Sequence, residues 1–140
     1  MKPIILFAVL SINFVSCKKD KALPVAETTS ASLQNATVIM AGNLSSYSET
    51  GSGSVKIYQQ SNGENVLGLE QMNLTVSNSL VVYLSTSATV SASSIKIFSA
   101  KNLNGNVYHI LPGDIDFTVF KYLIIQAELT EEIVAGSELS

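Results

Sequence analysis

The feature that most constrains the fold is a series of short runs rich in Val, Ile, Leu and Tyr, which begins near residue 37. Clusters of Gly, Asn and Ser separate these runs, and nothing between residues 37 and 140 requires a helix. Short strands with regular turn signals are typical of an antiparallel β-sandwich or a barrel-like domain. The sequence therefore predicts one all-β domain over residues 37–140, which is long enough to bury a core.

Individual runs predict particular strands. Residues 54–60 and 65–72 flank Ser61-Asn62-Gly63, a turn signal, and so predict a hairpin. Residues 80–84 are apolar without interruption, as expected of a central strand that is covered on both faces. The Ser/Thr/Ala-rich residues 85–94 predict a loop. The other expected strands are 37–42, 95–98, 107–111, 115–119 and 122–129, with a turn at 102–106.

The N-terminal segment has the features of a secretion signal. Lys2 gives it a positive start, residues 4–15 are mostly apolar, and charge returns at Lys18. A helix that spans a bilayer needs about 20 apolar residues, whereas the apolar region of a signal peptide needs about 7–15. The pattern therefore predicts that residues 1–16 are a signal peptide.

The only cysteine of the chain, Cys17, follows this segment directly. The run Phe14-Val15-Ser16-Cys17 resembles the lipobox of bacterial lipoproteins, although Phe14 replaces the usual Leu, Val or Ile. The resemblance implies that Cys17 becomes the mature N-terminus and carries a diacylglyceryl thioether and an amide-linked acyl chain. Because two or three acyl chains anchor a protein almost permanently, the expected partner is membrane lipid. The expected location is the bacterial cell envelope, at the outer membrane. The alternative is an ordinary cleaved signal peptide in which Cys17 is incidental.

Residues 17–36 are expected to tether the domain to this anchor. They contain Pro24 and many small or polar residues, without a helical apolar period. The run Lys18-Lys19-Asp20-Lys21 resembles signals that send lipoproteins to the cell surface. The alternative interpretation is a solvated linker, whose lysines are attracted to anionic lipid headgroups.

Composition excludes several classes of function. The chain has a net charge of -3 and no arginine, so no basic patch is expected for nucleic acid. One cysteine excludes an internal disulfide. With a single histidine as well, the chain lacks the residues for a zinc finger, a Cys-His nucleophile or thioredoxin-type chemistry.

An ordered series of motifs covers most of the expected domain. The motifs are Gly51-Ser52-Gly53-Ser54-Val55-Lys56-Ile57-Tyr58, Val66-Leu67-Gly68-Leu69-Glu70, Ser79-Leu80-Val81-Val82-Tyr83-Leu84-Ser85 and Gly105-Asn106-Val107-Tyr108-His109-Ile110-Leu111-Pro112. In order and spacing the series resembles the DM-thirteen domain, a small β-sandwich found beside DOMON modules in extracellular redox proteins. The resemblance extends from about residue 42 to residue 139.

The same resemblance implies a role in electron transfer, in which a cysteine of the closing strand acts as a thiol or as a ligand to a prosthetic group. In this chain Gln126 stands at that position. Glutamine has no accessible redox couple and is a poor metal ligand. The resemblance therefore implies the fold for this chain and does not imply the electron-transfer activity.

The remaining candidate groups do not assemble a recognised catalytic or metal site. His109 is a possible ligand or general base, but it has no second His or Cys to share a metal and is expected to be a structural strand residue. Gly51-Ser52-Gly53-Ser54 lacks the spacing of a nucleophile elbow and is expected to be a flexible turn. Asp114 and Asp116 share one face of an extended segment and are a candidate calcium pair. Without further acids nearby, the alternative is a polar turn followed by the solvent face of a strand.

Aromatic residues suggest one more site. Tyrosine rings stack on sugars, so five tyrosines are candidates for a carbohydrate-binding face, against the alternative of packing in the core or an interface. They are Tyr47, Tyr58, Tyr83, Tyr108 and Tyr122.

The sequence thus predicts a non-enzymatic, membrane-anchored lipoprotein whose domain has a binding or structural role. No cofactor and no metal are expected, and an envelope protein or a glycan is the expected partner besides lipid. One alternative is an electron-transfer module whose cofactor is supplied by a partner or bound by His109. The other is a carbohydrate-binding module of the cell envelope.

Overall fold

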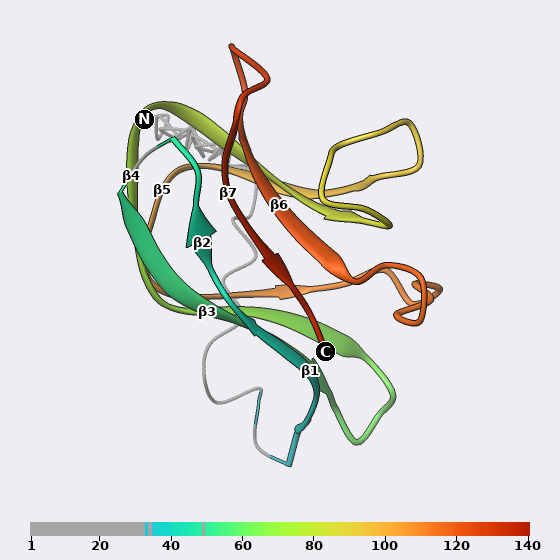
Figure 1. Cartoon of the computed structure of the whole chain (residues 1–140). Helices are drawn as coiled ribbons and strands as arrows, with labels where there is room; N and C mark the ends of the chain where they lie inside the picture. The colour runs from blue at the N-terminus through green and yellow to red at the C-terminus, as the bar shows by residue number, and fades with distance from the viewer. Residues whose placement is uncertain (1–32, 34, 49) are drawn as a thin grey trace, which may run out of the picture.

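The computed structural model describes residue 33, residues 35–48 and residues 50–140. The predicted signal peptide, Cys17 and most of the predicted tether lie outside these residues. The described part is mostly antiparallel β-structure, which confirms the predicted fold class (Figure 1). Its strands are β1 (Thr37–Asn43), β2 (Ser45–Ser46), β3 (Gly51–Gln59), β4 (Asn65–Ser85), β5 (Ile95–Ile110), β6 (Tyr122–Ala127) and β7 (Ile133–Glu138).

One strand, β4, connects the two halves of the domain. One edge of β4 pairs with β5 along almost its whole length. Its other edge pairs first with β3, up to Leu74, and then with β6, from Leu80 to Ser85. The hydrogen-bonded order is β1-β3-β4-β6-β7-β2, with β5 beside β4. Figure 1 shows the β4–β5 hairpin curving around the domain from the β1–β3 side to the β6–β7 side.

The β1 end of this order approaches the chain that follows β7, and the sheet nearly closes into a barrel. The backbones of Ala41 in β1 and Ser140 exchange two hydrogen bonds of 3.0 and 3.1 Å. The short strand β2 pairs with β7, so the chain near β1 contacts the far end of the sheet twice. These contacts satisfy part of an edge that would otherwise be open.

Side chains that point inward from both halves form one core. Successive residues of a strand face opposite sides, so Val55 and Ile57 of β3 point inward together with Leu67 and Leu69 of β4. Burying a large apolar side chain contributes roughly 1.5–3 kcal/mol to stability. The fully buried large side chains include Ile57, Leu67, Leu69, Leu74, Leu80, Leu84, Leu103, Leu123, Ile125 and Leu139.

Several local predictions are confirmed. The first hairpin turns at Ser61-Asn62-Gly63, where Gly63 has a φ of 87° and donates its N–H to the carbonyl of Gln60 at 3.0 Å. The residues between β4 and β5 form a loop, as expected. Residues 80–84 are a central strand with partners on both edges.

The predicted turn at residues 102–106 is wrong, because this segment lies inside β5. Asn104 pairs with Asn73, and Leu103 is fully buried in the core. The register between β4 and β5 shifts on both sides of this pairing, and Gly105 has a φ of 76°. The Asn- and Gly-rich sequence therefore accommodates a bend of the long hairpin instead of a chain reversal.

The strand expected at residues 115–119 is also absent from the described structure, since these residues form a turn. The carboxylate of Asp116 accepts hydrogen bonds from the N–H and the hydroxyl of Thr118, at 2.9 and 2.6 Å. The carbonyl of Asp116 accepts the N–H of Phe120 at 2.9 Å. This local network competes with strand pairing, although Phe117 and Phe120 still pack against the core.

Two further differences concern glycine-containing segments. Residues 51–54, expected to be a flexible turn, begin β3 and contain a bulge between Ser52 and Ser54. The final strand, β7, was not expected, because Ala135, Gly136 and Ser137 weaken its β-pattern. Its pairing with β6 stabilises this strand, although its own residues have a low preference for β-structure.

Candidate functional site

The outer face of β3, β4 and β5 carries a group of polar and aromatic side chains. Ser54, Lys56 and Tyr58 point outward because the residues between them, Val55 and Ile57, are in the core. Glu70 of β4 pairs with Ser54, and Tyr108 of β5 pairs with Gly68 of β4. Strand alternation and register therefore place side chains from three strands on one surface.

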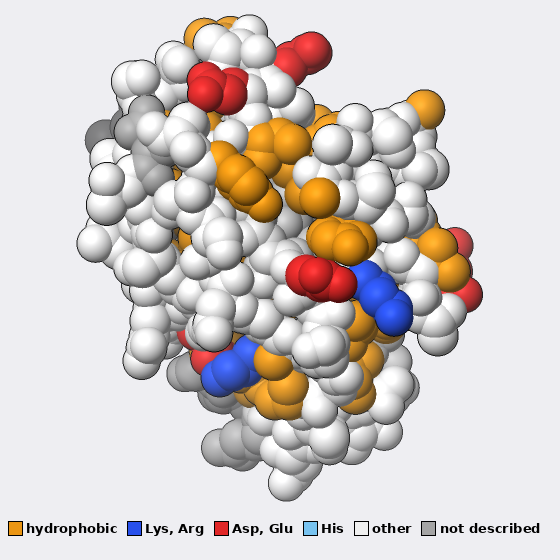
Figure 2. Space-filling model, in the orientation of Figure 1, with side chains coloured by type: hydrophobic (Ala, Val, Ile, Leu, Met, Phe, Trp, Pro, Cys, Tyr) orange, Lys and Arg blue, Asp and Glu red, His pale blue; other side chains and the backbone are white. Residues whose placement is uncertain are grey.

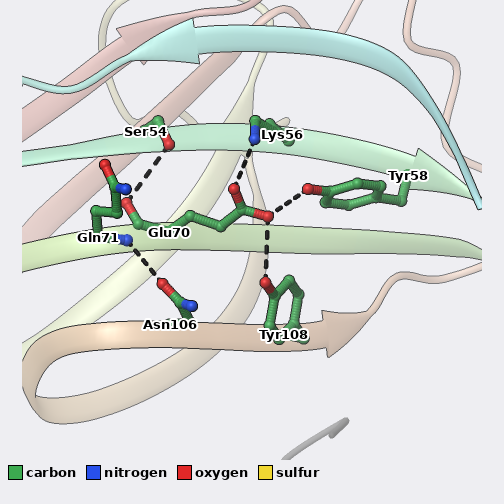
Figure 3. A network of polar contacts seen from close by, with 7 residues as sticks. All are labelled: Ser54, Lys56, Tyr58, Glu70, Gln71, Asn106 and Tyr108. Atoms are coloured by element: carbon green, nitrogen blue, oxygen red, sulfur yellow. Dashed lines mark hydrogen bonds and ion pairs between the residues drawn. The ribbon is translucent and has the colours of Figure 1, made fainter. Parts of the chain in front are cut away.

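The carboxylate of Glu70 lies at the centre of this group (Figure 3). Its Oε2 is 2.6 Å from Nζ of Lys56, and its Oε1 accepts the hydroxyl of Tyr58. The hydroxyl of Tyr108 donates to the same Oε1 at 3.2 Å. We call Lys56, Tyr58, Glu70 and Tyr108 the Glu70 network. It links the three strands through side chains as well as through their backbones.

A glycine makes room for the two tyrosines of the network. A Cβ atom at Gly68 would lie 2.8 Å from Cε2 of Tyr58 and 3.1 Å from Cε1 of Tyr108. The two rings meet edge to face above this residue, with centroids 6.4 Å apart and an interplanar angle of 61°. Such an arrangement is favourable for aromatic pairs. Any larger side chain at this position would push the rings apart.

The surroundings of the Glu70 network shift the pKa of Glu70 and the pKa values of its two tyrosines in opposite directions. Burial raises the pKa of Tyr58 and of Tyr108, and the Glu70 carboxylate beside them raises both further. Burial alone would raise the pKa of Glu70, but hydrogen bonds from Lys56 and Tyr58 outweigh it, so that the pKa is lowered. Glu70 is therefore ionised and both tyrosines are protonated at neutral pH.

A shallow groove of about 350 Å³ adjoins the network on the same face. Its walls come from β1, from β3 and from the C-terminal end of β7. They are formed by Ala41, Gly42, Asn43, Ser54, Val55, Lys56, Glu138 and Ser140. Lys56 thus belongs both to the groove and to the Glu70 network, and Tyr58 is the next outward residue along β3.

An apolar row borders the network on its other side. Val38, Tyr58, Val66 and Ile110 are in register across β1, β3, β4 and β5. Val38 and Ile110, at the ends of the row, are 45% and 44% exposed, whereas Val66 in the middle is fully buried. The surface therefore combines polar groups, aromatic rings and aliphatic side chains.

His109, the candidate ligand from the sequence, lies on the opposite face of the sheet from the Glu70 network. His109 pairs with Leu67, whose side chain is in the core, and its ring stacks on Phe98 with centroids 5.2 Å apart. Burial lowers the pKa of His109. Among the residues that the structure describes, no group of three or more His, Cys, Asp and Glu side chains is placed to hold a metal ion. His109 is thus separate from the Glu70 network.

Two other candidates have local structural partners. The Asp116 carboxylate is held by Thr118, whose hydrogen bonds lower its pKa, and the turn it forms replaces the extended segment expected to align it with Asp114. Nε2 of Gln126 donates to the carbonyl of Glu131 at 2.7 Å. Glu131 has a φ of 57°, so Gln126 supports the strained turn between β6 and β7.

The five candidate tyrosines do not share one face. Tyr58 and Tyr108 meet in the Glu70 network, whereas Tyr83 and Tyr122 lie in β4 and β6 beside the other half of the sheet. Tyr47 is 65% exposed and lies against Gly136 of β7. Figure 2 shows hydrophobic side chains gathered across the middle of the β6–β7 face, with a few acidic and basic groups among and around them.

Glu70 and Lys56 were not recognised as site residues from the sequence, although a signal for them exists. The hairpin turn at residues 61–63 fixes the register in which Lys56 pairs with Gly68. Glu70 is then the diagonal neighbour of Lys56 on the outer face. The contribution of Tyr108, in contrast, depends on a third strand far along the chain.

Comparison of the chain with models of protein families, with curated proteins and with solved structures found no match.

Proposed function

We propose that the chain is a membrane-anchored lipoprotein of the bacterial cell envelope whose β-domain binds a ligand or partner and catalyses no reaction on it. The anchor rests on the lipobox-like run that ends at Cys17. The non-catalytic role rests on the Glu70 network. The resemblance to the DM-thirteen domain is consistent with an extracellular setting.

The observation that carries this proposal is that the groups of the network satisfy one another. Glu70 accepts hydrogen bonds from Lys56, Tyr58 and Tyr108, so no strong base is left unengaged in it. A general acid or base works best when its pKa is near the operating pH. Here the pKa of Glu70 is lowered and that of each tyrosine is raised. The network is therefore suited to a fixed recognition surface and poorly suited to proton transfer.

Electron transfer is the alternative that the family resemblance implies. In this chain Gln126 holds a turn through Glu131, and His109 stacks on Phe98 beside the core. Neither side chain is turned toward the Glu70 network or the groove. A binding role therefore accounts for more of the described surface than a redox role does.

The proposal is tested by the intact mass and the visible spectrum of the full chain extracted from membranes. We expect a mature mass that begins at Cys17 and includes acyl chains, together with a featureless visible spectrum. Cys17→Ser should lack the acyl chains and leave the membrane fraction. A wild-type chain without acyl groups would overturn the anchor, and a visible absorption band would restore electron transfer as the leading function.

A further inference from the structure

We propose that the groove between β1, β3 and the end of β7, together with the neighbouring Tyr58 ring, binds a neutral glycan. This inference rests on the proposed binding function of the domain and specifies its ligand. The binding surface consists of Asn43, Ser54, Lys56, Tyr58 and Glu138.

The dimensions of this surface fit a short oligosaccharide better than a single small molecule. The groove, at about 350 Å³, is in the range of pockets that hold small ligands. Tyr58 follows Lys56 by two residues in β3, a distance of roughly 7 Å along a strand. A ligand that fills the groove and also covers the Tyr58 ring must extend beyond one sugar ring.

The polar groups of the groove match hydroxyl groups in kind. The amide of Asn43 can donate and accept a hydrogen bond, and the hydroxyl of Ser54, which donates to the Glu70 carbonyl at 3.5 Å, can accept one. The ammonium of Lys56 gives one of its three N–H groups to Glu70 and retains donors for a ligand. Glu138, whose Oε1 accepts the Tyr122 hydroxyl at 3.5 Å, adds a further acceptor from the end of β7. Sugar hydroxyls both donate and accept, so they can satisfy this mixed set.

The charges of the groove disfavour an acidic ligand. Lys56 is already paired with Glu70 at 2.6 Å, and Glu138 adds a carboxylate from the end of β7. The charged residues that line the groove are thus Lys56, which has its partner, and Glu138, so an anionic ligand would meet an excess of negative charge. A neutral glycan avoids this cost.

The aromatic rings supply an apolar platform beside these polar groups. Tyr58 is held by its hydrogen bond to Glu70 and by edge-to-face contact with Tyr108, so its ring is fixed before a ligand arrives. A rigid ring loses little entropy on binding. The C–H face of a sugar stacks on such a ring, while its hydroxyls reach the groove.

The test is binding of the full chain, in detergent micelles, to an array of neutral oligosaccharides and of uronic-acid oligosaccharides. Any neutral oligosaccharide that binds is then titrated and followed by near-ultraviolet circular dichroism. Because the chain has five tyrosines and no tryptophan, the long-wavelength part of this signal reports on tyrosine environments, while its five phenylalanines contribute at shorter wavelengths. We expect saturable binding of a neutral oligosaccharide and no comparable binding of the uronic acids.

Matched variants locate the site. Asn43→Ala removes an exposed side chain of the groove, and we expect affinity to fall about threefold to tenfold, the effect of one lost hydrogen bond. Tyr58→Leu removes the ring and should weaken binding to a similar degree, about threefold to tenfold. Asn73→Ala, at an exposed asparagine of β4 outside the groove, should bind as wild type does.

The outcomes separate this inference from the proposed function. A lipidated, folded chain that binds no neutral oligosaccharide, or that binds one equally well after Asn43→Ala and Tyr58→Leu, overturns the glycan site and leaves the anchor in place. Shortened oligosaccharides in the mixture would contradict the non-catalytic role. Glycan binding by a chain that carries no acyl groups would contradict only the anchor.

Discussion

The two halves of β4 have the same inner face and different outer faces. In both halves leucines point into one core, Leu67 and Leu69 in the first and Leu80 and Leu84 in the second. The outer face of the first half carries Glu70 and its partners. On the outer face of the second half Val81 is only 3% exposed, and Ser85 is fully buried and donates its hydroxyl to the Thr89 carbonyl at 2.7 Å.

This difference shows how one strand can serve two purposes. The second half pairs at its edges with β5 and β6, and Val81 and Ser85 on its outer face are buried. The first half also has a buried outer residue, Val66, but beside it the outer face is ordered by the part-buried hydrogen bonds of the Glu70 network. A surface that is ordered yet not covered by protein is the kind that a ligand can occupy.

The largest expected effect on stability comes from a substitution in the core under the second half of β4. Leu84→Ala should lower the free energy of unfolding by about 2–5 kcal/mol, because it leaves a cavity in the shared core. Urea denaturation followed by far-ultraviolet circular dichroism measures the change. The matched control is Leu129→Ala, at a leucine that is 78% exposed, and it should change stability by less than about 0.5 kcal/mol. Equal losses in the two variants would contradict the core assignment.

Removing the central carboxylate of the Glu70 network should lower the free energy of unfolding by a smaller amount. Glu70→Ala leaves Lys56, Tyr58 and Tyr108 without their common acceptor, and we expect a loss of about 1–3 kcal/mol by the same measurement. Glu70→Gln retains the shape and one acceptor, so its loss should be smaller. Glu128→Ala, at an exposed carboxylate after β6, is the control and should be nearly neutral. If Glu70→Ala is also neutral, the network does not stabilise the first half.

Acid should weaken the first half through the same carboxylate. The pKa of Glu70 is lower in the folded chain than its ordinary value of 4.5, so the stability it contributes is present above that value. As pH falls below 4.5 and through the folded pKa, this contribution is lost. Urea midpoints measured at pH 6 and at pH 3.5 should therefore differ more for wild type than for Glu70→Gln. The same pH dependence in both proteins would assign the acid sensitivity to other groups.

The smallest effect is expected at the turn that follows β6. Gln126→Ala removes the hydrogen bond to Glu131, and because this contact is exposed we expect a loss of about 0.5 kcal/mol. The expected local result is faster amide hydrogen exchange in residues 127–133 without a change in the Glu70 network. Slowed or unchanged exchange would show that Gln126 does not support the turn.

The parts of the fold predicted from the sequence are those that local patterns determine. The turn at residues 61–63 and the central strand at residues 80–84 can each be predicted from a few neighbouring residues. Asn-Gly pairs favour both a chain reversal and a bulge, so the sequence pattern predicts a turn where β5 only bends. The final strand was missed because β7 depends on its pairing with β6 more than on its own residues.

The candidate site, like the fold, can be predicted only in part from local sequence. Tyr58 and Tyr108 were candidates from the sequence, but their meeting above Gly68 required the register of two separate pairings. Lys56 and Glu70 lie on one hairpin, so their contact was within reach of a register argument. His109 and Gln126 were weighed for chemistry, and both proved to have structural neighbours that local sequence does not reveal.

The most direct test of the comparison between the two halves is an amide NMR spectrum of the full chain, titrated with the neutral oligosaccharide selected on the array. The account predicts shifts at Asn43, at residues 54–58, at Glu138 and around Glu70 and Tyr108, while residues 80–85 and β6 stay unchanged. Shifts centred on β6, or a spectrum that no neutral oligosaccharide alters, would contradict the account.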